Sequence, residues 1–306
     1  MSMDYEHSLM IKAVWCYYIE DMTQQAIADQ LGISRMRVIK LLEKGRAAKL
    51  IQFKIRADAY KQTEITNRLQ SRYSLKEIVL VPSISSNINE TVARATAMYL
   101  SDHITDGSFI NVGFGDTMSR TLRHLDLPED SKISFVSLTG GVKHYTVSSH
   151  DGGGISNTTS YIVPAPFIAS SAEMAAAIRE EPSVKDVLKL SSLASYTIVG
   201  IGGVTEKATV VKEGNMTAND LLRLRAESAV GDILGYFVDK DGHVLNGSIH
   251  DRLISTPPEV LATFPNVIAA AGGVEKAEAI DAVLKTGCIN ILITDEETAK
   301  ALLEIE

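Results

Sequence analysis

The chain has 306 residues, enough for two domains with hydrophobic cores, and 45% hydrophobic with 22% charged residues excludes an intrinsically disordered protein. No apolar run reaches the ~20 residues of a membrane-spanning helix, and the N-terminus lacks the apolar core of a signal peptide, so a cytoplasmic protein is expected. Cys16 and Cys288 lie far apart without a CxxC motif, which predicts buried, reduced thiols, with no metal and no cofactor.

The first part of the chain predicts three helices. Residues 5–20 form the first, and Thr23–Arg56 contains two more helices joined by a tight turn. Thr23 and Ser34 stand where these two helices begin, because a hydroxyl there accepts a hydrogen bond from a free backbone N–H, and Gly32 supplies the turn. Apolar residues at three- to four-residue spacing form the inner faces: Ala26, Ile27, Leu31, Val38, Leu41 and Leu42. A helix-turn-helix is therefore expected.

Charge is concentrated in the same region. From Ser34 to Arg56 eight basic residues stand against Glu43 alone, whereas the whole chain carries a net charge of −8. A solvated basic helix of an ordinary bundle would be the simplest explanation of such a run, but the capped helix-turn-helix spacing favours DNA binding. Residues 50–55 alternate apolar and polar side chains, as a strand or wing would. The predicted DNA-binding residues are Thr23, Gln24, Ser34, Arg35, Arg37, Lys40, Lys44 and Arg46.

The rest of the sequence predicts an α/β domain. Residues 57–76 predict an amphipathic linker helix after a DNA-binding domain of residues 1–56, and strands alternate with helices over 77–306. This alternation predicts a mostly parallel, doubly wound, Rossmann-like sheet with helices on both faces. Strands are expected at 78–81, 108–112, 133–138, 196–201, 233–238, 243–245, 267–271 and 289–293. Helices are expected at 88–104, 117–124, 172–179, 184–193, 221–226, 274–285 and 296–303.

Four of these strands end in glycine-rich turns: GFGDT, LTGG, VGIGG and AAGG. Ligands of open α/β sheets bind beyond the carboxyl ends of the strands, and glycine lets the backbone approach an anion. With the hydroxyl of Thr117 and the amine of Lys276, the turns favour a small phosphorylated ligand, although glycine also closes many ordinary strand–helix corners. The GFGDTM stretch lacks the third glycine of a dinucleotide-binding loop, which argues against NAD.

Several segments of the chain resemble the SorC family of bacterial sugar-responsive transcriptional regulators. The segments are TQQAIA, LGISR, LL and Arg46 in the first part, then GFGDTM, LTGG, AVGDI and the terminal block AAGGVEKAEAIDAVLKTGCINILITDEETAKALL. The resemblance implies an N-terminal helix-turn-helix joined to an effector domain similar to phosphosugar isomerases. It also implies operator DNA and a phosphorylated sugar or polyol as partners, and a homo-oligomer, a dimer or a tetramer.

The glycine turns and the resemblance together give the expected effector site. By resemblance, Gly115 and Thr117 help to hold the effector, Asp232 meets its hydroxyls and Lys276 holds its phosphate. His250 stands where the family often has asparagine, next to Asp251. The expected effector-binding residues are Gly113, Phe114, Gly115, Asp116, Thr117, Met118, Thr139, Gly140, Gly141, Asp232, Leu234, Asp251 and Lys276.

Two other functions stay open at this level. A phosphosugar isomerase with an accessory DNA-binding domain would need acid–base groups, which Asp232, His250 and Asp251 could supply. A DNA-binding module with a purely structural oligomerisation domain would need no effector. The polar loop 144–161 is either a lid over the site or a surface loop, because long polar loops are functional or disordered. Its two histidines are too few for a metal site.

Overall fold

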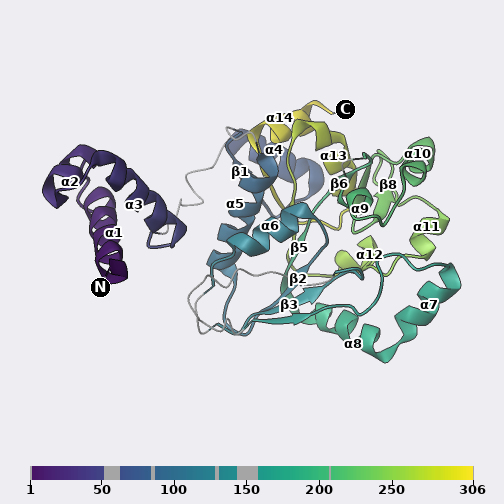
Figure 1. Ribbon diagram of the computed structural model, residues 1–306. Helices are drawn as coiled ribbons and strands as arrows, with labels where there is room; N and C mark the ends of the chain where they lie inside the picture. The colour runs from purple at the N-terminus through teal and green to yellow at the C-terminus, as the bar shows by residue number, and fades with distance from the viewer. Residues whose placement is uncertain are drawn as a thin grey trace. The chain divides into compact units, whose positions relative to one another are not determined.

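The computed structural model describes residues 2–51, 63–83, 87–127, 131–142, 158–206 and 208–305. The chain divides into two compact units, Met1–Arg56 and Ala57–Glu306 (Figure 1). Most of the expected wing and of the expected lid loop lie outside the described residues, so both remain predictions. Among the described residues, no helix combines the length and the apolar composition needed to cross a membrane.

The N-terminal unit is the expected trio of helices, α1 (Ser2–Tyr18), α2 (Gln24–Leu31) and α3 (Arg35–Ala47). Gly32 ends α2 in the left-handed conformation, with φ of 64°, and its N–H bonds to the carbonyl of Ala28. Only a residue without a Cβ adopts this conformation at little cost, so the turn between α2 and α3 follows from the glycine. The three helices enclose one core: Leu9, Met10, Ala13, Val14, Ile27, Ala28, Val38, Leu41 and Leu42.

The larger unit begins with α4 (Thr63–Tyr73), which covers the second half of the expected linker helix. It is built on a seven-stranded sheet in which every neighbouring pair is parallel. The strands, in spatial order, are β1 (Glu77–Val81), β10 (Ile291–Asp295), β9 (Val267–Ala270), β5 (Ala194–Val199), β2 (Phe109–Val112), β3 (Ser134–Ser137) and β4 (Thr159–Tyr161). The parallel α/β prediction is confirmed, and β4 is an edge strand that the sequence analysis missed.

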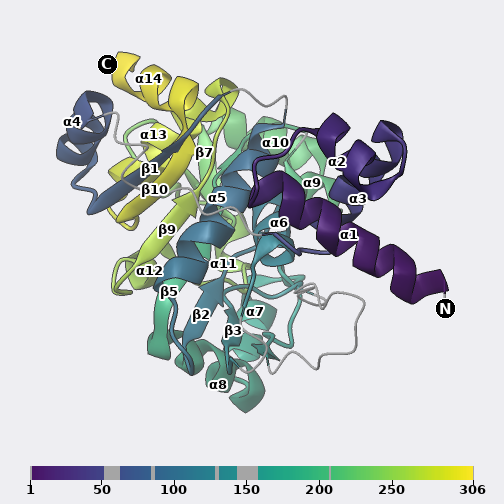
Figure 2. The ribbon, with the colours of Figure 1, turned by 90° about the vertical axis from the view of Figure 1, so that its left-hand side faces the viewer.

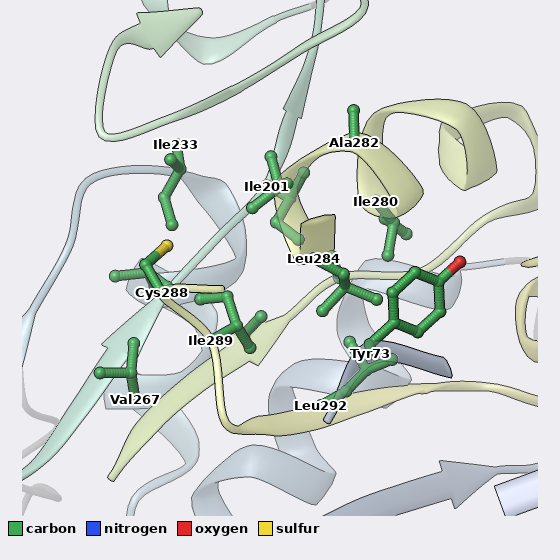
Figure 3. Packing of buried hydrophobic residues seen from close by; sticks show 14 of the residues in the cluster. Tyr73, Ile201, Ile233, Val267, Ile280, Ala282, Leu284, Cys288, Ile289 and Leu292 are labelled. Carbon is green, nitrogen blue, oxygen red and sulfur yellow. The ribbon is translucent and has the colours of Figure 1, made fainter. Parts of the chain in front are cut away.

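Helices cover both faces of this sheet (Figure 2). One face packs against α5 (Ile88–His103) and α6 (Asp116–His124). The other face packs against α4, α13 (Ala277–Lys285) and α14 (Glu296–Glu304). Figure 3 shows this second core, where Tyr73 of α4 meets Ile280 and Leu284 of α13 above Leu292 of β10. Near-continuous apolar strands such as β9 are expected when both faces are buried. The remaining helices beside the sheet are α7 (Ala172–Glu180), α8 (Pro182–Leu190), η2 (Ser191–Leu193) and η3 (Val274–Lys276).

The larger unit also has a second, antiparallel sheet of three strands. It contains β6 (Gly202–Gly203), β7 (Gly231–Ile233) and β8 (Tyr236–Val238). Where the sequence predicted one strand at 233–238, a tight turn at Leu234–Gly235, with φ of 53° and 86°, separates β7 from β8. Two positive φ values suit the right-handed twist of a hairpin, but leucine is an unusual first residue for such a turn, so the sequence does not signal it. The chain turns back again at 239–242, where Val238 bridges Val244 and the N–H of Leu245 donates to Phe237 O at 2.9 Å, so the residues expected as a strand at 243–245 pair with β8. Short helices flank this sheet: α9 (Thr209–Lys212), α10 (Ala218–Ala226), α11 (Ser248–Asp251) and α12 (Pro258–Leu261).

Candidate functional site

The candidate DNA interface is the exposed side of α3. Thr23 and Ser34 cap their helices as expected, since their hydroxyls accept hydrogen bonds from Ala26 N–H at 3.2 Å and Arg37 N–H at 3.3 Å. Capping fixes where α3 begins and therefore which side chains its first turns present. Five basic residues of α3 are exposed: Arg35, Arg37, Lys40, Lys44 and Arg46.

Arg35 lies at the rim of a shallow hollow between the helices of this unit. The hollow has a volume of about 660 Å³. It is lined by Tyr17, Tyr18, Asp21, Met22, Thr23, Gln24, Gln25 and Arg35. The start of α2 and the start of α3 thus come together, which brings Thr23, Gln24 and Arg35 of the expected DNA-binding set to one place.

Lys44 of α3 forms an ion pair with an acidic residue of α1. Its Nζ lies 3.0 Å from Oε1 of Glu6 on α1. The hydrogen bond from Lys44 lowers the pKa of Glu6. A phosphate of DNA would have to compete with this carboxylate for the ammonium group.

The four glycine-rich turns of the chain lie side by side. Strands β9, β5, β2 and β3 are consecutive in the sheet and parallel, so their carboxyl ends meet at one edge. The residues after them are Gly272-Gly273, Gly200–Gly203, Gly113–Gly115 and Gly140-Gly141. The sequence therefore predicted correctly that these turns gather in space.

The N–H groups of four of these glycines, however, are occupied within the protein. Gly113 N–H donates to Ile198 O, Gly140 N–H to Ile254 O and Gly141 N–H to Ala165 O, each at 2.8 Å. The N–H of Gly273 donates to Asp295 Oδ2 and to Thr298 Oγ1. Buried backbone donors are nearly always paired, and here the partners lie on neighbouring strands, loops and α14. These glycines shape the edge of the sheet, and their N–H groups do not point to an open anion site.

The start of α6 lies at the same edge. Gly115, with φ of 130°, precedes the helix, and the first-turn N–H groups of an α-helix have no partner inside the helix. Asp116 is the first residue of α6 and pairs with Arg120 at 2.8 Å. Thr117 is buried beside it, and Met118 packs into the core under the helix. Met118 is thus a packing residue of this turn.

Lys276 lies at this edge among several charged groups. The carboxylates of Glu275, Asp116 and Asp232 favour its charged form electrostatically, whereas Lys212 opposes it. Burial is the larger effect and lowers the pKa of Lys276, whose Nζ lies 3.5 Å from Asn89 Oδ1. Burial raises the pKa of Asp232 to about 6, although the N–H of Gly235 donates to its Oδ2 at 3.1 Å.

Apolar and unpaired polar groups complete the surroundings. Leu234, two residues after Asp232, packs against Gly113, because a Cβ on that glycine would lie 2.9 Å from Cδ2 of Leu234. The ring of Phe114 stacks on Phe167 with centroids 5.3 Å apart. Thr139 is fully buried, and in the described part of the chain its Oγ1 has no hydrogen-bond partner.

Asp251 and its neighbour His250 have different surroundings. The carboxylate of Asp251 is exposed on α11, and its backbone carbonyl accepts a hydrogen bond from Arg179 at 3.0 Å. The Nε2 of His250 accepts the N–H of Phe237 at 3.0 Å, and Nδ1 lies 2.7 Å from the carbonyl of Leu245. Burial lowers the pKa of His250. Both ring nitrogens are committed to the backbone, so this histidine has a structural role.

Comparison with known proteins agrees with both units. The Sugar-bind model, a sugar-binding domain, matches residues 57–304, and the model of sigma-70 region 4 matches residues 10–48. The chain is 34% identical over 305 residues to the transcriptional regulator LsrR of Enterobacter sp. (strain 638), covering 98% of this chain and 94% of that protein. It is 36% identical over 304 residues to the transcriptional regulator LsrR of Escherichia coli (strain K12), covering 97% and 95%.

Among solved structures, the full-length sorbitol operon regulator SorC from Klebsiella pneumoniae has the same fold. Its TM-score is 0.72 at 24% identity, and the match covers 97% of this chain and 98% of that one. The matched domain binds sugar and the relatives are transcriptional regulators, so the chain is a DNA-binding, sugar-controlled regulator and not an enzyme. The reading as a phosphosugar isomerase is therefore wrong. The chain belongs to the SorC family of sugar-responsive transcriptional regulators.

Proposed function

We propose that the effector of this regulator is a phosphorylated sugar or polyol bound at the carboxyl edge of the parallel sheet. The observation that carries the proposal is the partly buried Lys276 after β9, which interacts electrostatically with Asp116, after β2, and with Asp232, whose strand β7 pairs with the turn after β5. A partly buried ammonium beside two carboxylates suits a ligand that is anionic at one end and hydroxylated at the other. The ammonium binds the phosphate, and the carboxylates accept hydrogen bonds from the hydroxyls.

The remaining contacts are assigned by their chemistry. The first-turn N–H groups of α6, at Asp116 and Thr117, point toward the phosphate, because helix N-termini bind anions. The Oγ1 of Thr139, which has no partner among the described residues, is a hydroxyl that a ligand can satisfy. Leu234 and Phe114 form the apolar wall. Asp251 joins the site only through movement of α11, because its carboxylate is exposed.

In the same proposal, α3 lies in the major groove of operator DNA. Arg35 and Arg37, in its first turn, contact bases or phosphates, while Lys40, Lys44 and Arg46 contact phosphates. The protein acts in the cytoplasm as a homo-oligomer, a dimer or a tetramer. The effector changes operator affinity by binding one state of the oligomer more tightly, with a coupling of ~1–3 kcal/mol, the usual size for such proteins.

The test is a thermal-shift screen of the full chain. The panel contains sorbitol 6-phosphate, fructose 6-phosphate, glucose 6-phosphate, glycerol 3-phosphate and inorganic phosphate, with the free sugars as controls. A ligand present at 100 times its Kd stabilises by ~2.7 kcal/mol, which raises the melting temperature by several degrees. A shift with one phosphorylated compound, absent with its free sugar, supports the proposal. Shifts with free sugars alone would overturn the assignment of a phosphate to Lys276.

A further inference from the structure

The start of α5 contacts both sides of the proposed effector site. Asn89 Oδ1 lies 3.5 Å from Lys276 Nζ, and the next residue, Glu90, accepts a hydrogen bond from Arg120 Nη1 at 2.7 Å. Arg120 then donates through Nε to Asp116 Oδ2 at 2.8 Å. One guanidinium therefore joins the carboxylate of Glu90 to the carboxylate of Asp116.

Arg120 and Glu90 are partly shielded from solvent, and Arg120 pairs with two carboxylates. The side chains of Arg120 and Glu90 are 26% and 24% exposed, whereas that of Asp116 is 46% exposed. Hydrogen bonds from Arg120 and then from His124 lower the pKa of Glu90 to about 2. The two carboxylates raise the pKa of Arg120. Arg120 is thus anchored on its Glu90 side and presents Asp116 on the more open side.

The contact with Arg120 reduces an electrostatic repulsion that Asp116 would otherwise have with the effector. Asp116 stands at the start of α6, where the proposed phosphate binds, and two negative charges in one place repel each other. A guanidinium that holds the carboxylate by one oxygen reduces this repulsion and fixes the direction of the other oxygen. Nε and Nη1 reach two carboxylates at once because of the fixed fork of arginine, which a lysine lacks.

We infer that Arg120, anchored by Glu90, is a positioning residue that directs the carboxylate of Asp116 to the hydroxyls of the effector. This inference rests on the proposed function and names a residue that acts through Asp116 without touching the ligand. A purely structural bond between α5 and α6 is the other reading of the same contacts. The two readings differ in whether the effect of Arg120 depends on Asp116.

A double-mutant cycle separates the two readings. Affinity for the panel phosphate that stabilises the wild type is measured by isothermal titration for Arg120→Gln, Asp116→Asn and the double variant. We expect Arg120→Gln and Asp116→Asn each to weaken binding about tenfold, the size of one charged hydrogen bond. The double variant should bind as weakly as Asp116→Asn alone, because Arg120 has then nothing left to position.

Two further variants serve as controls. Arg120→Lys keeps the charge but not the fork, so it should bind like Arg120→Gln, and it replaces that variant in the cycle if the glutamine variant does not fold. Arg94, whose side chain is 63% exposed on α5, is another ion-pair partner of Glu90. Arg94→Gln removes this partner and should leave affinity for the effector unchanged.

Each other outcome decides against the inference. Equal losses from Arg120→Gln in the wild-type and Asp116→Asn backgrounds would show that Arg120 acts independently of Asp116. Unchanged affinity in Arg120→Gln would show that it positions nothing. Absence of binding by the wild type to every phosphate in the panel would instead overturn the proposed function itself, and the inference with it.

Discussion

The carboxylate of Asp232 occupies the space beside Gly202 that a side chain there would need. The two residues are partners in the antiparallel pair β6–β7, and a Cβ on Gly202 would lie 2.0 Å from Asp232 Oδ1. Real atoms do not approach this closely, so any larger residue at this position displaces the carboxylate. Gly202 of the VGIGG turn is therefore explained by the buried carboxylate of Asp232, which fills this space, and not by a bound anionic ligand.

Replacing Gly202 with alanine should disturb the effector site through Asp232. We expect the affinity for the stabilising panel phosphate to fall at least tenfold, since a displaced carboxylate loses its hydrogen bonds to the ligand. Isothermal titration measures the loss. Gly203→Ala is the matched control on the same strand, because its Cβ would meet only Thr205 Cγ2 at 3.8 Å, an ordinary contact. Equal behaviour of the two variants would contradict this account.

Local signals in the sequence predicted the N-terminal unit well. The hydroxyls of Thr23 and Ser34 and the left-handed Gly32 determine helix ends from within a few residues. The alternation of strands and helices likewise predicted the parallel sheet. These features depend on neighbours in the chain, so a pattern in the sequence contains them.

Other features depend on residues distant in the chain, and the sequence did not reveal them. Within the described part of the chain, the edge strand β4 pairs with β3 alone, and its three residues have no distinct pattern of their own. Gly202-Gly203 looked like a strand-ending turn but forms β6, because β7 pairs with it. The link from Glu90 through Arg120 to Asp116 joins two successive helices through residues 30 positions apart, a spacing that no local pattern signals, so only the fold reveals it.

Lys276→Ala should separate DNA binding from effector response. The residue belongs to the sugar-binding unit, so operator affinity without effector should stay within a factor of two. The thermal shift with the panel phosphate should disappear, because the ammonium that pairs with the phosphate is gone. Lys300→Ala is the control, since its exposed side chain pairs with Glu297 on α14. A Lys276→Ala variant that still responded fully would place the phosphate elsewhere.

Arg35→Ala should abolish specific operator binding. The side chain is exposed in the first turn of α3, beside Thr23 and Gln24, so the fold and the melting temperature should be retained. We expect a loss of at least tenfold in affinity for promoter DNA, the usual size for a lost base contact. Lys12→Ala, an exposed cation on α1, is the control. Unaltered affinity of Arg35→Ala in a gel-shift titration would remove α3 from the interface.

Glu6→Gln tests the same interface with a gain of affinity. The substitution removes the carboxylate that holds Lys44 at 3.0 Å and leaves the ammonium available for DNA phosphate. Operator affinity should rise several-fold at low salt, and the affinity should fall more steeply with salt concentration, because one more phosphate contact releases one more counterion. Gel-shift titrations at two salt concentrations measure both effects. A slope equal to that of the wild type would mean that Lys44 does not meet phosphate.

The ion pair of Glu90 should make stability depend on pH in a defined window. Arg120, first among its partners, lowers the pKa of Glu90 from the ordinary 4.5 to about 2 in the folded protein. A carboxyl with a depressed pKa stabilises the fold above its unfolded pKa and loses this contribution as pH falls toward its folded pKa. The difference in unfolding free energy between wild type and Glu90→Gln should therefore be largest at neutral pH, about 1–2 kcal/mol, and shrink steadily below pH 4.5.

Denaturant titrations between pH 7 and pH 3 measure this difference. Glu297→Gln is the matched control, since that side chain is 54% exposed and forms an ion pair with Lys300 on the same helix. Exposed pairs contribute little, so its effect should stay under about 0.5 kcal/mol at every pH. A Glu90→Gln difference that kept its size down to pH 3 would mean that the loss comes from packing between α5 and α6 and not from the charge of the carboxylate.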